Sequence, residues 1–163
     1  MASAMFAGSF DPVHRGHLGV IERGATLFDR LWVVAAGNPA KPSGMLSLEA
    51  RADLISAATA HLPNVEAIAH SGLLVELART LGVDALLRSA AKERANEFEM
   101  AYANACLAGI VTVFVPPRAD SRWISSRIVR ERLDRGDLPA VAEMLPPPVA
   151  SALGISVLAR PRT

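Results

Sequence analysis

At 163 residues this chain has the length of about one domain, and its 51% of apolar residues favours a globular protein over a disordered one. The 17 basic and 16 acidic residues leave a net charge of +1, which argues against a protein that binds nucleic acid through bulk electrostatics. We expect neither a signal peptide nor a membrane span, because no basic segment precedes a long apolar run and no run approaches about 18 uninterrupted apolar residues.

Strand-like segments recur along the chain as short apolar or β-branched runs, which predict five strands. These runs lie at residues 3–8, 30–37, 64–69, 83–88 and 110–117. The run over 30–37, RLWVVAAG, is continuous, which is typical of a strand that is buried on both faces.

Helix-like segments stand between the predicted strands. The first begins after Pro12 and places Leu18, Ile21, Ala25 and Phe28 on one face. Capping and stop residues predict the others, which begin at Ser47 and cover 73–82, 92–109 and 125–136, with short helices broken by prolines inside 137–154. Proline and glycine predict a loop over 38–45, and about ten residues at the end form a tail without a predicted role.

This alternation predicts an α/β fold, a Rossmann-like five-stranded parallel sheet with helices on both faces, in one domain over residues 1–163. In such sheets ligands bind at the carboxyl ends of the strands, near the point where the strand order reverses. Three chemically suggestive stretches fall there: residues 8–17, the chain from Arg88 onward, and residues 121–130.

A single cysteine, Cys106, excludes an internal disulfide and fits a reducing compartment, so we expect a cytoplasmic protein. Unpaired cysteine usually behaves as a small apolar residue, and we expect Cys106 to be buried.

The stretch over residues 8–17, GSFDPVHRGH, predicts a strand end, a tight turn and a helix start. Free backbone N–H groups at a helix start attract phosphate, and here they would lie beside two imidazoles. Gly8 would let the backbone approach a ligand closely, and Gly16 would leave room between His14 and His17. Two histidines without a further ligand nearby make a poor zinc site, so we predict no metal site. A second alternative to phosphate binding is that both rings make only local hydrogen bonds and take no part in catalysis.

The same residues resemble the first signature of the nucleotidylyltransferase superfamily, a His or Thr followed by x-Gly-His at the start of the first helix. Residues 123–133, WISSRIVRERL, resemble its second signature, an Ile-Ser-Ser segment followed by a basic residue. Within the superfamily the chain is most similar to the phosphopantetheine adenylyltransferases over about residues 4–150. Four further stretches carry that similarity: 38–51, 61–67, 71–79 and 96–104.

The resemblance implies transfer of AMP from ATP to 4′-phosphopantetheine, giving dephospho-CoA and pyrophosphate in coenzyme A biosynthesis, with Mg²⁺. It also implies a homohexamer with small-molecule substrates and without nucleic-acid or membrane partners. The nucleophile in this reaction is an ionised phosphate oxygen, so positioning and charge stabilisation suffice and no strong general base is needed.

Carried over by resemblance, the catalytic residues would be His17 at the α-phosphate, Lys41 over the acceptor phosphate and Arg88 on the same phosphate. Leu74 would contact the pantetheine arm through its backbone, and Ser9 would contact substrate through turn atoms. The nucleotide would lie against Ser9, Phe10, His14, His17, Ser89, Ala90, Ala91, Glu99, Ser121, Arg122, Trp123, Ile124, Ser125, Ser126 and Arg127.

Each of these assignments has a simpler alternative. Lys41 could be a solvated loop residue, Arg88 a surface arginine, Leu74 a core leucine and Glu99 an exposed helix residue. Ser125 and Ser126 stand where a helix cap is expected, and capping is compatible with phosphate binding.

The chain departs from the phosphopantetheine branch at two places. Residues 88–91 read RSAA where the branch usually has Arg-Gly-x-Arg, and losing a charge-assisted contact of this kind costs about 1.5–3 kcal/mol. Arg127, where the family more often has a third serine, could supply the missing charge.

The second departure is His14, where the branch generally has Thr and the mononucleotide and phospho-alcohol transferases have His. Two alternatives therefore stay open. One is a nucleotidylyltransferase that uses nicotinate or nicotinamide mononucleotide, or a phospho-alcohol with CTP. The other is a nucleotide-binding paralogue with weakened or lost catalysis.

Overall fold

The computed structural model describes residues 1–37, 44–90 and 95–155, without the side chains of residues 95–98 and 107. Within these ranges five parallel strands form one sheet in the order β3-β2-β1-β4-β5. The strands are β1 (Ser3–Gly8), β2 (Arg30–Gly37), β3 (Val65–Ser71), β4 (Ala85–Ser89) and β5 (Val111–Val115).

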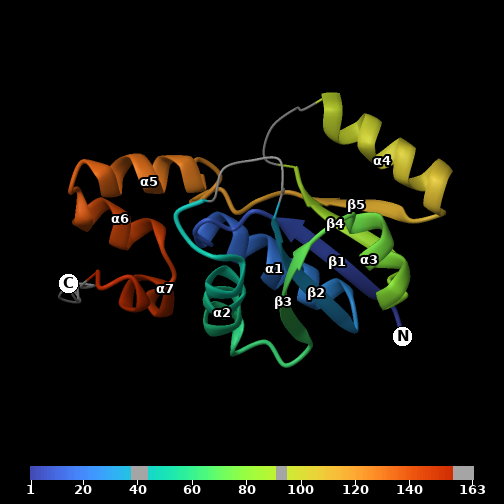
Figure 1. The fold of residues 1–163 in the computed structure, drawn as a ribbon, viewed down its shortest axis with the longest axis horizontal. Coiled ribbons are helices and arrows are strands. Elements are labelled where there is room, and N and C mark those ends of the chain that lie inside the picture. The colour runs from blue at the N-terminus through green and yellow to red at the C-terminus, as the bar shows by residue number, and fades with distance from the viewer. Residues whose placement is uncertain (38–43, 91–94, 156–163) are drawn as a thin grey trace.

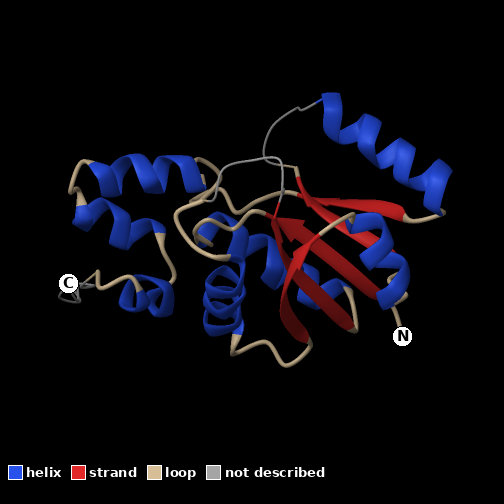
Figure 2. Ribbon diagram, in the orientation of Figure 1, coloured by secondary structure: helices blue, strands red, loops and turns tan. Residues whose placement is uncertain are grey.

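Helices follow each strand and cover the sheet on both sides (Figure 2). They are α1 (Arg15–Leu27), α2 (Leu48–Thr59), α3 (Leu74–Leu81), α4 (Ala95–Ala108), α5 (Ser126–Asp134), α6 (Leu138–Met144) and α7 (Pro147–Ala152). The last three lie together at one end of the ribbon, and α4 lies at the other end (Figure 1). The predicted α/β architecture is confirmed.

Two hydrophobic cores, one on each face, explain why the strands read as continuous apolar runs. Along β1, Phe6 packs into the larger core with α1, α2, α5, α6 and α7, while its neighbour Met5 packs into the smaller core with α3. Successive side chains of a strand point to opposite faces, so both positions must be apolar when helices cover both faces. In β2, Leu31 to Ala35 are all buried, as the RLWVVAAG run predicts.

Helix α1 packs differently from the predicted stripe. Ile21 is buried as expected, but Leu18, Ala25 and Phe28 are only half-buried, and the buried residues of the helix are Gly16, Gly19, Val20, Ile21 and Gly24. A Cβ on Gly24 would overlap the side chains of Leu87 and Leu31. Gly24 therefore lets the helix approach β2 and β4 closely, and a prediction from the spacing of apolar side chains does not identify such a glycine.

The predicted element ends are close to those observed, with two informative differences. Strand β3 continues to Ser71 because its pairing with β2 extends to Gly37, although His70 and Ser71 do not continue the apolar pattern. Strand β5 is shorter than the predicted 110–117. Cys106 lies exposed on α4, so the expectation of a buried cysteine is wrong. From residue 156 on, the predicted tail lies outside the described residues.

Among the described residues, no helix combines the length and apolar character that crossing a bilayer requires.

Candidate functional site

The strand order reverses between β1 and its neighbour β4, since β2 and β3 lie on one side of β1 and β4 and β5 on the other. The carboxyl ends of these two strands, at Gly8 and Ser89, therefore border the crevice in which open α/β sheets bind ligands. Arg88 links the two strand ends, because its Nη1 donates to the carbonyl of Ala7 at 3.5 Å. The loop after β1 and the predicted residue Arg88 thus meet at one place.

The loop that leaves β1 is held by a buried aromatic ring. Phe10 is fully buried with a φ of 47°, a left-handed conformation that is uncommon for a bulky residue. Its ring covers Gly8, where an added Cβ would lie 3.2 Å from the ring. The space beside Gly8 is therefore filled by the protein's own Phe10 and not left for a ligand, contrary to expectation. Ser9, next to it, is exposed.

His14 and His17 cap helix α1 reciprocally. Nδ1 of His14 accepts from the backbone N–H groups of Gly16 at 3.1 Å and His17 at 3.4 Å, while Nδ1 of His17 accepts from the His14 N–H at 3.4 Å. The two rings stack with centroids 3.7 Å apart, and Phe10 meets His17 edge-on at 4.8 Å. A Cβ on Gly16 would come within 2.9 Å of the His14 ring, so Gly16 provides the room predicted for it.

This arrangement determines the protonation of both rings. Because both Nδ1 atoms accept hydrogen bonds, each neutral imidazole carries its proton on Nε2. Burial lowers the pKa of His14 to about 4. Burial, and then the charge of His14, lowers the pKa of His17 well below 6.5. Near pH 7 the pair is therefore neutral, and each ring offers an N–H donor at Nε2.

The helix start itself differs from the expected cradle of free N–H groups. The N–H groups of Gly16 and His17 already bond to the His14 ring, and the N–H of Leu18 bonds to the His14 carbonyl at 3.0 Å. The groups of this first turn that could attract an anion are therefore the positive end of the helix dipole and the imidazole Nε2–H groups, since these backbone N–H groups are already bonded.

The segment before α5 lies against the start of α1. The carbonyl of Ser121 would be 3.1 Å from a Cβ on Gly16, and the Ser121 hydroxyl is buried without a hydrogen-bond partner among the described residues. Ser125 caps α5 by accepting from the Ile128 N–H at 3.3 Å. Ser126 donates to the carbonyl of Pro12 at 3.0 Å, which joins α5 to the β1–α1 loop.

The other predicted residues of this segment differ in their exposure. Trp123 is 55% exposed and donates from Nε1 to the Asp120 carbonyl at 3.0 Å, while Arg122 is exposed and Ile124 is buried. The side chain of Arg127 is 78% exposed and pairs with Glu131 at 3.4 Å.

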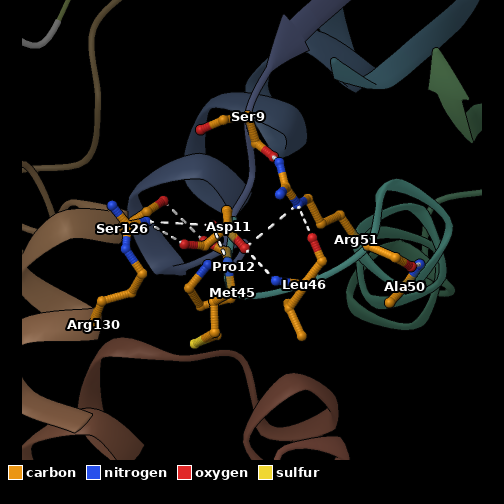
Figure 3. Close-up of polar contacts among 10 residues, drawn as sticks. Ser9, Asp11, Pro12, Met45, Leu46, Ala50, Arg51, Ser126 and Arg130 are labelled. Carbon is orange, nitrogen blue, oxygen red and sulfur yellow. Dashed lines mark hydrogen bonds and ion pairs between the residues drawn. The ribbon is translucent and has the colours of Figure 1, made fainter. Parts of the chain in front are cut away.

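Asp11 and Arg51 are residues of this site that the sequence reasoning missed. The Asp11 carboxylate accepts from the N–H groups of Met45 and Leu46, both at 2.9 Å, and faces Arg51 at 3.4 Å and Arg130 at 3.7 Å (Figure 3). The available signals were the Asp of the GSFDP turn and the basic residue that ends ISSRIVR. Neither signal identifies Arg51, which comes from α2.

Three further predicted residues lie on α3, on α4 and directly after β4. Leu74 begins α3 and packs its side chain against the smaller core. Glu99 is exposed on α4, at the opposite end of the ribbon from α5 (Figure 1). Ala90 follows β4 and donates its N–H to the Val115 carbonyl at 2.9 Å. Lys41 and Ala91 lie outside the described residues.

Metal ligands do not gather in the described part of the chain, where no group of three His, Cys, Asp or Glu side chains could hold an ion. Asp11, the acidic side chain of the loop, is already engaged by two arginines and two N–H groups. The described residues therefore do not fit a protein-held Mg²⁺ site.

A surface hollow of about 600 Å³ lies elsewhere, among residues that include Ser3, Arg30 and Val65 at the amino ends of three strands. Ligands of open α/β sheets bind at the carboxyl ends, so this hollow is not the candidate site.

Comparison with known proteins identifies the family of this chain. A family model described as cytidylyltransferase-like matches residues 5–132. The curated phosphopantetheine adenylyltransferase of Corynebacterium diphtheriae is 39% identical over 155 residues, covering 94% of this chain and 96% of that protein. The protein of the same name from Haemophilus influenzae strain 86-028NP is 39% identical over 157 residues, covering 94% and 98%.

Among solved structures, a Vibrio parahaemolyticus protein assigned provisionally as a nicotinate-nucleotide adenylyltransferase superimposes with a TM-score of 0.64. It is 21% identical and the match covers 94% of this chain and 92% of that one. At this identity the likeness concerns the fold, and it agrees with the parallel sheet described above.

Proposed function

This chain belongs to the cytidylyltransferase-like family and, within it, to the phosphopantetheine adenylyltransferases, and from that premise we propose that it transfers AMP from ATP to 4′-phosphopantetheine. An oxygen of the acceptor phosphate forms the new bond to the α-phosphorus of ATP. The bond from that phosphorus to the bridging oxygen breaks, and pyrophosphate leaves with the electron pair. The products are dephospho-CoA and pyrophosphate, a step of coenzyme A biosynthesis.

The observation that carries the reaction type is the neutral His14–His17 pair at the start of α1, beside the switch point of the sheet. In the proposed reaction the Nε2–H of His17 donates to an oxygen of the α-phosphate as negative charge builds up there. A fixed donor in a partly buried site is a strong stabiliser of such charge, because it needs no reorganisation during the reaction. The acceptor phosphate is already ionised, so no residue has to remove a proton from it.

The capping role of His14 removes a reason to prefer a mononucleotide or a phospho-alcohol as the acceptor. Its Nδ1 performs a helix-capping role, and threonine is itself a common capping residue. The Thr that is usual in the phosphopantetheine branch and the His of this chain can therefore serve the same structural purpose. His14 by itself is then no sign of a different acceptor.

Groups around the loop support nucleotide and acceptor binding. Arg88 lies half-buried at the carboxyl end of β4, in reach of Ala7, where we propose that it binds the acceptor phosphate together with Lys41. The Ser121 carbonyl lies against Gly16 at the start of α1, and the Ser126 hydroxyl bonds to the Pro12 carbonyl just before that helix, which supports our proposal that residues 121–127 contact the nucleotide.

Mg²⁺ enters the proposal only as a companion of ATP. When bound to the triphosphate it would neutralise phosphate charge, as in other phosphoryl-transfer reactions. The described residues offer no cluster to hold it, so no step of the proposal passes through a protein-bound metal.

We also propose a cytoplasmic homohexamer, in keeping with the family resemblance. The exposed side chains of Met100 and Tyr102 on α4 and Val111 on β5 support self-association, since they are large apolar groups on neighbouring elements at one end of the sheet. Light scattering coupled to size-exclusion chromatography tests the assembly, and a monomer at micromolar concentration would contradict it.

A panel of donor and acceptor pairs tests the activity. Purified protein is offered ATP or CTP with 4′-phosphopantetheine, nicotinate mononucleotide, nicotinamide mononucleotide or a phosphocholine-type acceptor, and pyrophosphate release is followed. We expect turnover with ATP and 4′-phosphopantetheine. Turnover only with a mononucleotide, or only with CTP, would refute the proposed substrates, and no turnover with any pair would favour the non-catalytic paralogue.

A further inference from the structure

Asp11 occupies a position that the proposed reaction does not explain. It lies in the β1–α1 loop, between Phe10 and Pro12, and is 5% exposed. Its two carboxylate oxygens accept one backbone N–H each, Oδ2 from Met45 and Oδ1 from Leu46, both at 2.9 Å. These two N–H groups lie 34 and 35 residues along the chain, immediately before α2. The side chain therefore joins the loop to the segment that leads into α2.

Arg51 extends this connection from the first turns of α2. Its side chain is 9% exposed and lies 3.4 Å from Oδ1 of Asp11. It donates from Nε to the Leu46 carbonyl at 2.9 Å and from Nη1 to the Ser9 carbonyl at 3.2 Å. One buried guanidinium thus holds carbonyls of both segments that Asp11 joins.

Arg130 makes the corresponding connection from α5. Its Nη1 donates to the Asp11 carbonyl at 2.5 Å and lies 3.7 Å from Oδ2 of the Asp11 carboxylate. Ser126, one turn earlier on the same helix, bonds to the carbonyl of Pro12. The loop is therefore attached to α5 through two consecutive carbonyls, across about 115 residues of sequence.

There is little free space around these contacts. A Cβ on Gly44 would overlap both Nη2 of Arg51 and Oδ2 of Asp11, so the chain passes directly over the ion pair. Figure 3 shows contacts reaching Asp11 from the segment before α2, from Arg51 on α2 and from Arg130 on α5. Multiple buried contacts of this kind leave the loop one conformation.

We infer that Asp11, with Arg51 and Arg130, is a positioning residue that sets the spacing between the His14–His17 pair and the flanking α2 and α5 segments. The inference rests on the proposed function, because Lys41 and residues 121–126, which are expected to hold the acceptor and the nucleotide, come directly before or at the start of α2 and α5 in the sequence. Displacing a reacting group by about 1 Å can cost about 10²-fold in rate, so a device that fixes this spacing has a direct catalytic consequence.

The charges of the cluster distinguish a positioning role from one in which the cluster attracts the phosphates of ATP. One carboxylate faces two guanidinium groups, so Asp11→Asn raises the local positive charge. If the cluster served mainly to attract ATP, that variant would bind ATP more tightly. If it positions the loop, the variant keeps ATP affinity within about threefold and loses kcat, because binding in the ground state tolerates small displacements that the transition state does not.

The experiment compares kcat, KM for both substrates and the calorimetric Kd for ATP in wild type, Asp11→Asn, Arg130→Lys and Gly44→Ala. Arg132 and Asp137 provide the matched control, since they form an Arg–Asp ion pair at 2.6 Å between the end of α5 and the start of α6, away from the loop. We expect a fall of about 10²-fold in kcat for Asp11→Asn. Arg130→Lys should lose less, because lysine retains the charge without the fork geometry. Arg132→Lys and Asp137→Asn should remain near wild type.

Folding is monitored by circular dichroism and thermal midpoint, so that activity is compared per folded molecule. A double variant of Asp11→Asn and Arg130→Lys should lose less kcat than the product of the two single losses, because the variants share the Asp11–Arg130 ion pair, while the Arg130 bond to the Asp11 carbonyl is altered only by Arg130→Lys. Asp11→Asn with wild-type kcat, a loss that matches Asp137→Asn, or a loss confined to ATP affinity would overturn the inference.

The panel of acceptors keeps this outcome distinct from that of the proposed function. If wild type uses another acceptor, the substrate proposal fails, and the same variants are compared with that acceptor. If wild type uses 4′-phosphopantetheine and Asp11→Asn is unaffected, the function stands and the positioning role fails. No turnover by wild type with any pair would overturn both.

Discussion

Replacing His14 with Asn should remove a defined part of the protein's sensitivity to acid. His14 is buried, and burial lowers its pKa from 6.5 to about 4. In the folded protein His14 therefore binds a proton only near pH 4, whereas in the unfolded chain it binds one near pH 6.5. The contribution of neutral His14 to stability is complete above pH 6.5, declines as the pH falls from 6.5 to about 4, and changes no further below that.

The size of the effect follows from the width of this window. Each unit of pKa difference corresponds to 1.36 kcal/mol. At about pH 5, which is about 1.5 units below 6.5, protonation of His14 alone therefore favours the unfolded state by about 2 kcal/mol. Asparagine retains an oxygen that can cap α1 but has no proton to gain. Between pH 7.5 and pH 5 the wild type should therefore lose about 2 kcal/mol more stability than His14→Asn.

Urea unfolding at pH 7.5, 6.5, 5.5 and 5.0 measures this difference, with His61→Ala as the control because His61 is exposed on the surface beside Glu22. The wild-type and His61→Ala curves should decline in parallel, and the His14→Asn curve should be shallower. Equal pH dependence in wild type and His14→Asn would refute the neutral buried pair and, with it, the assignment of the proton to Nε2.

His17→Ala should lower kcat by about 10²–10³-fold while ATP Kd changes only a few-fold, since its donor acts on the transition state; equal losses in stopped-flow turnover and calorimetric affinity would contradict that role. Gly16→Ala should destabilise the fold by about 1–3 kcal/mol in urea unfolding, because the new Cβ meets the His14 ring and a backbone carbonyl. Gly19→Ala is its control, since there the Cβ meets only the flexible side chain of Arg118, and a cost equal to that of Gly16→Ala would refute the steric argument. Arg127→Ala should leave stability within about 0.5 kcal/mol, since its ion pair is exposed. The same variant should weaken ATP binding by about one to two decades if Arg127 replaces the missing second arginine, and unchanged ATP affinity would show that it does not.

Local sequence patterns were sufficient for the order and type of the main elements. The continuous apolar run of RLWVVAAG became β2, because a strand between two helical layers has no polar face. Gly82 ends α3 with a φ of 63°, the left-handed conformation that glycine adopts without strain. Ser47 and Ser125 cap their helices through side-chain oxygens, as their positions predicted.

The same patterns did not identify what fills the space around the site. Gly8 suggested an open approach for a ligand, and Phe10 occupies that space instead. The first-turn N–H groups of α1 were expected to be free, and His14 takes two of them. Both differences arise because a sequence pattern reports which groups are present and not which neighbours satisfy them.

The sequence by itself determined the alternation of strands and helices, the position of the β1–α1 loop and the family to which the chain belongs, because these depend on residue type and short-range spacing. The predicted roles of the individual site residues stay predictions. Only the tertiary structure decided that Asp11 joins Met45, Leu46, Arg51 and Arg130 in one buried cluster. Those partners lie between 34 and 119 residues from Asp11, and contacts at that separation exist only once the sheet has brought its strand ends together.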